Sequence, residues 1–257
     1  MFPEYDIIVV GAGHAGCEAA AAAANMGSKV LLVTMNMQTI AQMSCNPAMG
    51  GIAKGQIVRE IDALGGYSGI VTDQSMIQFR MLNRSKGPAM WSPRAQSDRM
   101  LFSMKWREML ENTPNLDFYQ DMVHGLLIKD RRCIGVKTGL GHEIKAKAVV
   151  LTNGTFLNGI IHIGEKNFGG GRMAEKAATG ITEQLVSLGF ESDRLKTGTP
   201  PRIDGRSLDY SKMEEQPGDD EITGFSFLKK PHLKPQEQRS CWITYTSQAV
   251  HDTLKTG

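Results

Sequence analysis

The sequence predicts an α/β fold built on a parallel sheet, and three features near its beginning carry this prediction. Residues 6–10 form a short apolar run rich in β-branched side chains, which is typical of a buried parallel strand. Residues 14–26 include six consecutive alanines, which favour a helix close to a sheet, and Gly27 is suited to end it. Residues 29–34 form a second strand. Strand, helix and strand within about 30 residues predict a right-handed βαβ unit.

The composition is that of an ordinary globular protein. The chain has 257 residues, of which 41% are hydrophobic and 22% are charged, with a formal net charge of +2. This length allows one large α/β domain, alone or with an insertion, and the small charge excludes a chain-wide surface for nucleic acid. The first residues carry Glu4 and Asp6 and no basic region, so we expect no signal peptide. No apolar run is long enough to span a bilayer, so we expect no membrane span.

The cysteines and histidines show no ligand-like spacing, so we expect no metal site. Without a secretory signal, the cysteines predict reduced thiols in a cytoplasmic protein. The cysteines are Cys17, Cys45, Cys133 and Cys241.

Two helices are predicted after the βαβ unit. A loop at 44–51 leads into a helix at 53–64, which a pair of glycines closes. A second helical pattern covers 94–112 and stops before Pro114.

Short strands and exposed segments follow. Residues 116–150 predict a small antiparallel meander with turns at 130–131 and 139–141, which leads into an apolar strand at 148–151. A glycine-rich turn and a helix are expected within 169–189. From residue 202 onward, prolines, an acidic run at 219–221 expected to be a solvated loop, and basic residues at 229–230 indicate an exposed connection or an inserted domain, with a strand at 241–246.

The glycine motif between the first strand and the first helix is G-x-G-x-x-G. Its first glycine permits a tight turn, its second lets the backbone approach a pyrophosphate, and its third allows close helix–strand packing. The helix N-terminus adds amide donors for the phosphates. The strand, helix and strand around the motif predict a Rossmann-type dinucleotide site. The predicted site residues are Gly11, Ala12, Gly13, His14, Ala15 and Gly16.

The ribose contact departs from the usual pattern. An acidic residue about 20 positions beyond the motif normally binds the ribose, whereas this chain has Thr34, Met35 and Asn36 there. Asn36 still offers a hydrogen bond.

A later segment distinguishes FAD from NAD. Residues 147–154 (KAVVLTNG) resemble the strand and small-residue turn that end the β-meander in flavoproteins of the glutathione-reductase class. FAD is therefore the favoured ligand and NAD alone the alternative. The late Gly-Asp motif of that class is missing, so we expect domain 1–203 to be an FAD-binding domain completed by a further C-terminal part, and 204–257 to start an inserted α/β domain.

Cys45 lies in the loop SCNPAMGG, and two interpretations of it remain open. A lone cysteine is usually a buried, inert thiol. A cysteine in a tight loop before a helix can instead be a thiolate nucleophile. The other three cysteines are expected to be structural.

Two basic segments are candidates for phosphate contacts. Residues 80–107 contain seven basic residues, one acid, and the aromatic residues Trp91, Phe102 and Trp106, which suits either a base-stacking surface or a solvated helix face with buried aromatics. The turn at 196–202 either grips a phosphate or links domains, which makes Lys196 and Arg202 candidate substrate contacts.

Six segments, in order across nearly the whole chain, resemble the tRNA uridine 5-carboxymethylaminomethyl modification enzyme family, also called GidA or MnmG. The family's chains are longer and carry a helical C-terminal domain. The matching segments are GAGHAG at 11–16, QMSCNPAMGGIAKG at 42–55, LNRSKGPA at 82–89, RAQSDR at 94–99, GTFLNGIIHIG at 154–164 and LKTGTPPRID at 195–204.

The resemblance implies an FAD enzyme that modifies C5 of the wobble uridine of tRNA with a GTPase partner. It implies methylenetetrahydrofolate as carbon donor, glycine or ammonium as amine donor, NADH as reductant, and a homodimer. Residues 11–16 would bind the FAD pyrophosphate and Val123 the adenine through its backbone. Cys45 would be a nucleophile at uridine C6 or a proton donor. We expect this fragment alone to be inactive.

Three alternatives stay open beside this reading. They are a folate- and FAD-dependent tRNA uridine C5-methyltransferase, a general FAD oxidoreductase, and a non-catalytic binding module.

Overall fold

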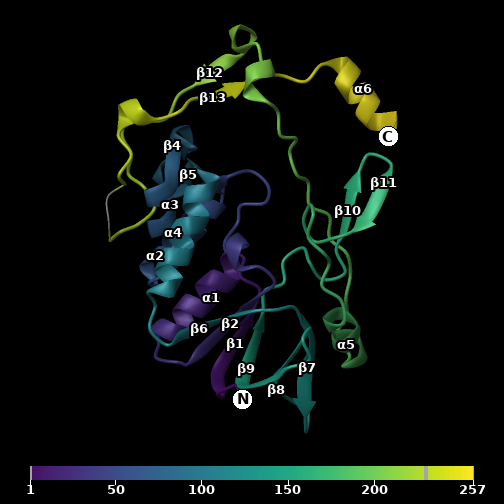
Figure 1. Cartoon of the computed structure of the whole chain (residues 1–257). Coiled ribbons are helices and arrows are strands. Elements are labelled where there is room, and N and C mark those ends of the chain that lie inside the picture. Colours follow the sequence, from purple (N-terminus) through teal and green to yellow (C-terminus); the bar gives the residue numbers. More distant parts are fainter. Residues whose placement is uncertain (1, 229–230, 257) are drawn as a thin grey trace.

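The computed structural model describes residues 2–228 and 231–256, which leaves the basic pair at 229–230 outside the described residues. Its main sheet has the strand order β6-β2-β1-β9-β8-β7 (Figure 1). The first four strands are parallel, and the last two are antiparallel to their neighbours. The strands are β1 (Tyr5–Val10), β2 (Val30–Thr34), β6 (Leu116–Gln120), β7 (Val123–Lys129), β8 (Arg132–Thr138) and β9 (Glu143–Leu151).

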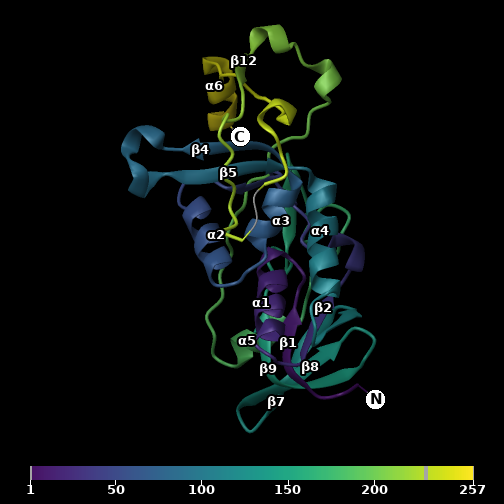
Figure 2. The ribbon, with the colours of Figure 1, turned by 90° about the vertical axis from the view of Figure 1, so that its left-hand side faces the viewer.

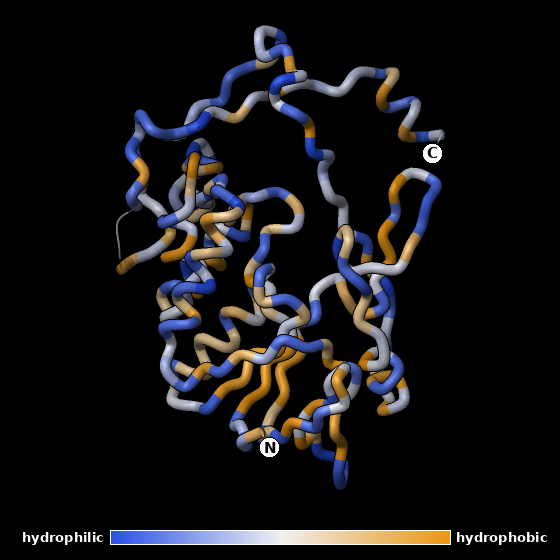
Figure 3. The backbone as a smooth tube through the Cα atoms, viewed as in Figure 1, coloured by the Kyte–Doolittle hydropathy of each residue, from blue (hydrophilic) through white to orange (hydrophobic). Residues whose placement is uncertain are grey.

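Both faces of the parallel strands are buried. On one face, α1 (His14–Asn25) and α4 (Arg99–Glu111) pack through small alanines and through Phe102 and Trp106. On the other face, Ile181 of α5 (Ile181–Ser187) belongs to a second core cluster together with Val136 of β8 and Ile144 of β9. Burial on both faces explains why these strands read as continuous apolar runs, which Figure 3 shows as the most hydrophobic part of the tube.

A smaller antiparallel sheet lies beyond the carboxyl ends of the parallel strands. Its strand order is β3-β5-β4, and α2 (Lys54–Ala63) and α3 (Ser68–Ser75) lie against it (Figure 2). Phe79, Ala95 and Phe225 form its core. The strands are β3 (Ala48–Gly50), β4 (Met76–Leu82) and β5 (Ser92–Ser97).

The later part of the chain is extended. The hairpin β10 (Ile160–Ile163) and β11 (Lys166–Gly169) precedes α5, and residues 191–204 carry no regular structure. The chain then crosses above the smaller sheet (Figure 1). It contains β12 (Glu214–Gln216), β13 (Cys241–Ile243) and α6 (Gln248–Thr256).

Short 3-10 turns link several of these elements. They are η1 (Met37–Thr39), η2 (Arg84–Lys86), η3 (Pro88–Met90), η4 (Gly205–Ser207), η5 (Tyr210–Lys212) and η6 (Pro235–Glu237).

Two buried carboxylates fasten the later part to the earlier part. Asp73 accepts hydrogen bonds from the backbone N–H groups of Phe225 and Ser226, each at 2.8 Å, and Asp62 accepts one from Phe227 at 2.7 Å. Both carboxylates have 3% of their surface exposed, so they act as buried anchors for residues 225–227.

The predicted α/β class and the Rossmann-type βαβ unit are confirmed, and four local predictions are wrong. The predicted loop at 44–51 contains β3, and the predicted helix at 94–112 is β5 followed by α4, which Asp98 caps. Residues 116–120 are a parallel strand beside β2 rather than part of the meander. The acidic run at 219–221 is not wholly solvated, because Asp219 bonds to Met81 and Arg84.

Candidate functional site

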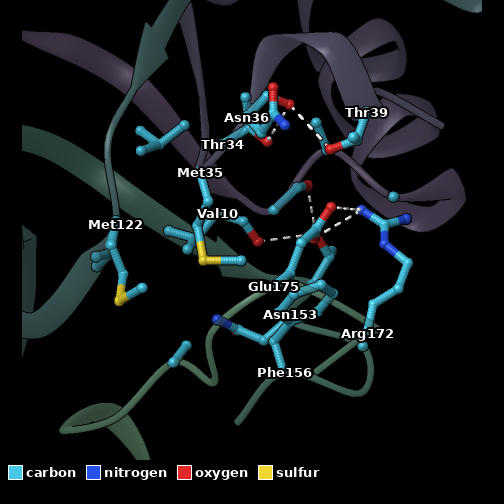
Figure 4. Close-up of a pocket in the computed structure, with 18 of the residues that line it drawn as sticks. Val10, Thr34, Met35, Asn36, Thr39, Met122, Asn153, Phe156, Arg172 and Glu175 are labelled. Atoms are coloured by element: carbon cyan, nitrogen blue, oxygen red, sulfur yellow. Dashed lines mark hydrogen bonds and ion pairs between the residues drawn. The ribbon is translucent and has the colours of Figure 1, made fainter. Parts of the chain in front are cut away.

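A cavity of about 260 Å³ opens at the carboxyl ends of β1, β2 and β9. The helix after β1, α1, belongs to one core cluster, and the helix after β9, α5, belongs to the cluster on the other face. Open α/β sheets bind ligands beyond the carboxyl ends of two such neighbouring strands. Gly11, Ala12 and Gly13, which the glycine motif predicts, and Val123, which the family resemblance implies, line this cavity together with Asn36. Figure 4 shows Met122 on the opposite side of the cavity from Arg172.

The three glycines of the motif have different structural roles. Gly11 has a φ of +100°, and a Cβ there would lie 2.7 Å from the carbonyl oxygen of Thr152. A Cβ on Gly16 would collide with the carbonyl of Gly11. A Cβ on Gly13 would meet no protein atom within 4 Å. Gly11 and Gly16 therefore serve the fold, whereas Gly13 leaves open space for a ligand.

Thr152 holds the glycine turn in place. Its hydroxyl lies 2.9 Å from the carbonyl oxygens of both Val10 and Gly11, and its backbone N–H donates to Val10 at 2.9 Å. The start of α1 has no side-chain cap, because Gly13 occupies the N-cap position. Its first N–H groups and the positive end of the helix dipole are thus available to an anion.

His14 contributes its backbone to the turn and not its ring. The ring nitrogen Nε2 lies 3.1 Å from the carbonyl oxygen of Ala41, and the ring packs against Phe102 with a centroid separation of 5.4 Å. Burial lowers the pKa of His14, so the ring is neutral near pH 7. His14, Ala15 and Gly16 form the beginning of α1 and are not among the residues that line the cavity.

Two buried oxygens in the cavity wall lack hydrogen-bond partners. They are Oε1 of Gln42 and Oδ1 of Asn153, and neither has a partner among the described residues. An unpaired buried acceptor is costly, so both fit a ligand that brings hydrogen-bond donors. Together with the open space at Gly13, they fit a dinucleotide better than an apolar ligand.

Arg172, Glu175 and Phe156 form a cluster in the wall that the sequence reasoning missed (Figure 4). The Nη2 atom of Arg172 lies 2.8 Å from both carboxylate oxygens of Glu175, and its guanidinium lies 5.7 Å from the Phe156 ring centroid. The Nη1 atom donates to the Ser44 hydroxyl at 3.1 Å. The sequence signal for this cluster is the run of three glycines before Arg172. Gly171 is needed there because a Cβ at this position would collide with the Phe156 ring.

Cys45 lies next to the cavity, beside its lining residue Ser44. Two residues of the 196–202 segment hold it. The Arg202 guanidinium donates to the carbonyl oxygen of Cys45 at 2.7 Å, and the Thr199 hydroxyl lies 3.5 Å from its sulfur. Lys196 is exposed and has no side-chain hydrogen bond or ion pair to the residues that the structure describes.

The other cysteines lie within regular elements. Cys17 is fully buried in α1, and burial strongly raises the pKa of its thiol. Cys133 and Cys241 are partly buried in β8 and β13.

The basic stretch 80–107 is only partly a surface. Phe102 and Trp106 are fully buried in the core, so they stack on no base. Lys105 and Arg107 form ion pairs within α4. Trp91 is 43% exposed and lies at the β4–β5 connection.

Across residues 2–228 and 231–256, no cluster of His, Cys, Asp or Glu has metal-binding geometry. No helix in the same residues is both long and apolar enough to cross a membrane.

Comparison with known proteins points to one family. A family model described as "Glucose inhibited division protein A" matches residues 6–257. The tRNA uridine 5-carboxymethylaminomethyl modification enzyme MnmG of Cytophaga hutchinsonii is 76% identical over 257 residues, which are 100% of this chain and 41% of that protein. The enzyme of the same name from Flavobacterium johnsoniae is 72% identical over 256 residues, covering 99% and 41%. The chain thus spans 41% of the length of these curated relatives.

Solved structures agree with this match. GidA of Aquifex aeolicus in its form I crystal superposes with a TM-score of 0.95 at 48% identity, covering 99% of this chain and 43% of that one. The GidA-related protein from Thermus thermophilus has a TM-score of 0.53 at 24% identity, covering 73% of this chain and 69% of that one, which is a likeness of fold.

Proposed function

This chain belongs to the glucose-inhibited division protein A family, and on that premise we propose that its protein is an FAD enzyme that modifies the wobble uridine of tRNA. The observation that carries the proposal is the cavity at the glycine turn, with Cys45 beside its lining residue Ser44. The names of the relatives support tRNA uridine as the substrate.

The residues around the cavity fit FAD. The turn at Gly11, Ala12 and Gly13 and the N-terminus of α1 would hold the pyrophosphate. The backbone of Val123 would contact the adenine, and Gln42 and Asn153 would accept hydrogen bonds from the ligand. Bound FAD supplies the redox chemistry, with NADH as the reductant.

Cys45 would act on the uridine. As a nucleophile its thiolate would add to C6, which would make C5 nucleophilic toward the carbon that methylenetetrahydrofolate donates. Loss of the C5 proton with elimination of the thiolate from C6 would then restore the C5–C6 double bond and the free thiolate. As an acid it donates a proton instead. Glycine or ammonium would complete the new group at C5. Arg202 holds the Cys45 carbonyl, which suits a role in positioning the loop, and Lys196 remains a candidate contact for tRNA phosphate.

The family resemblance supports three further proposals about the whole protein. We propose a GTPase partner, a homodimer and a cytoplasmic location. We also propose that residues 1–203 form an FAD-binding domain completed by a C-terminal part, and that residues 204–257 begin an inserted domain.

Flavin binding tests the cofactor. The absorption spectrum of the full-length protein with added FAD should show a shifted flavin band. The Gly13→Val variant should weaken FAD binding by more than about tenfold, because its side chain would occupy the space that the pyrophosphate needs. The protein itself tolerates the change, since a Cβ at Gly13 meets no protein atom within 4 Å. The matched control is Gly169→Val in the β10–β11 hairpin, which also meets nothing within 4 Å. No flavin band in the unaltered protein would overturn the proposal.

Loss of the Cys45 thiol tests the catalytic role. In the full-length protein with its GTPase partner, folate and NADH, Cys45→Ser should lower tRNA modification by at least about 100-fold. Cys133→Ser serves as the control, because Cys133 lies in β8 and is absent from the cavity lining. Modification at the unaltered rate in Cys45→Ser would remove the cysteine from the mechanism.

A further inference from the structure

Arg172 connects the cavity to the loop that carries Cys45. It lies in the cavity wall, and its side chain is 17% exposed. One arm of its guanidinium binds Glu175, which also lines the cavity, and the other arm binds Ser44, the residue before Cys45. A planar guanidinium cannot move one arm without moving the other.

We infer that Arg172 is a positioning residue through which occupancy of the cavity sets the geometry of the Cys45 loop. The inference rests on the proposed function, because it takes FAD as the occupant.

The buried Nε atom of Arg172 supports this role. It has no hydrogen-bond partner among the described residues, so the two arms make all of the guanidinium's hydrogen bonds to them. A ligand in the cavity contacts the wall that Phe156, Arg172 and Glu175 form, and thereby restricts the rotamers open to the arginine. Restricting the rotamers fixes the Nη1 donor toward Ser44, so the loop loses freedom when the cavity fills.

The second arginine at the loop has a different position. Arg202 binds the carbonyl oxygen of Cys45 but is not among the residues that line the cavity. Cys45 is therefore held from two sides, and only the contact through Ser44 reaches the ligand site. Of the two arginines at the loop, Arg172 is thus the one that joins the far wall of the cavity to Ser44.

Alkylation of Cys45 measures this coupling directly. The rate of its reaction with iodoacetamide in the full-length protein, followed by peptide mass spectrometry, is compared with and without saturating FAD. FAD should slow the reaction about three- to tenfold, the range that the net contribution of one ordinary, exposed hydrogen bond supplies.

Two substitutions separate positioning from simple shielding. Ser44→Ala removes only the acceptor, and Arg172→Lys keeps a charge for Glu175 but cannot hold both partners. In each variant the ratio of the rates without and with FAD should fall to near one. The controls, Ser187→Ala and Arg206→Lys, remove comparable contacts at exposed sites and should keep the ratio of the unaltered protein.

The outcomes are distinct. A ratio that persists in both Ser44→Ala and Arg172→Lys means that FAD shields the thiol directly, and the inference is wrong. A flavin band without any change in the alkylation rate of the unaltered protein overturns the inference alone. An unaltered protein that binds no FAD overturns the proposed function and this inference together.

Discussion

Asp62 and Asp73 are both buried, and each carboxylate accepts hydrogen bonds from backbone N–H groups. Asp73 serves Phe225 and Ser226, and Asp62 serves Phe227, whose ring lies 4.5 Å from the Arg59 guanidinium. Burial raises the pKa of Asp73 from its ordinary 3.8 to about 6, with the neighbouring Asp62 adding to the rise and the two backbone hydrogen bonds opposing it. The anchor for residues 225–227 therefore depends on pH.

The sign of this dependence follows from proton linkage. Since the pKa of Asp73 is higher in the folded state, its contribution to stability is fully present below about 3.8 and is lost as pH rises through about 6. Lowering the pH from 7.5 to 5 should make opening of residues 225–227 cost about 1 kcal/mol more. Hydrogen exchange of these amides, corrected for its intrinsic pH dependence, measures the change.

Two variants complete this experiment. Asp73→Asn should abolish the rise, and Asp130→Asn, on the exposed turn between β7 and β8, should keep it. Weaker protection at pH 5 in the unaltered protein would mean that the hydrogen bonds from Phe225 and Ser226 outweigh the cost of burying the charge.

At the scale of elements, β4 is an edge strand whose open side the chain itself covers. The Asp219 N–H donates to the carbonyl of Phe79, and its carboxylate accepts from the N–H of Met81 at 2.7 Å. Gln238 accepts from the N–H of Phe79, and the Arg239 N–H donates to Ile77. Residues 219 and 238–239 thus satisfy the groups that would otherwise template pairing with another chain.

Asp219→Ala should release this cover. It leaves the N–H of Met81 without its acceptor and removes the partner of Arg84, which should cost about 1–3 kcal/mol. Trypsin cleavage after Arg239, whose N–H donates to Ile77 in this cover, should accelerate accordingly. The neighbouring Asp220→Ala is the control, because Asp220 is exposed. Equal cleavage rates in the two variants would show that Asp219 contributes nothing to the cover.

The elements that the sequence predicted correctly are those whose signal lies within a few neighbouring residues. The alanine run and Gly27 define α1, and the two turns define the β7–β8–β9 meander. Residues 94–97 were assigned to a helix because their spacing continues that of α4, yet they pair with β3 and β4. Such pairing depends on residues far along the chain, and no local pattern reports it.

At the scale of the whole molecule, the site also contains residues that neighbour one another in the sequence and residues that only folding brings together. Gly11, Ala12 and Gly13 were predicted because one contiguous motif contains them, and Val123 came from family resemblance. Arg172 and Ser44 are 128 positions apart, and only the folded chain brings them together. The cavity is therefore assembled from several segments, of which the sequence alone identified the one with a contiguous motif.

The position of β9 carries a consequence for synthesis. β1 is made before its second neighbour in the sheet, residues 146–151 of β9, which follows about 140 residues later. At about 5–20 residues per second, a nascent chain waits on the order of ten seconds before that edge of β1 is covered. Thr152, which holds the glycine turn, arrives at the same moment. The glycine turn is thus made long before the residue that holds it in place.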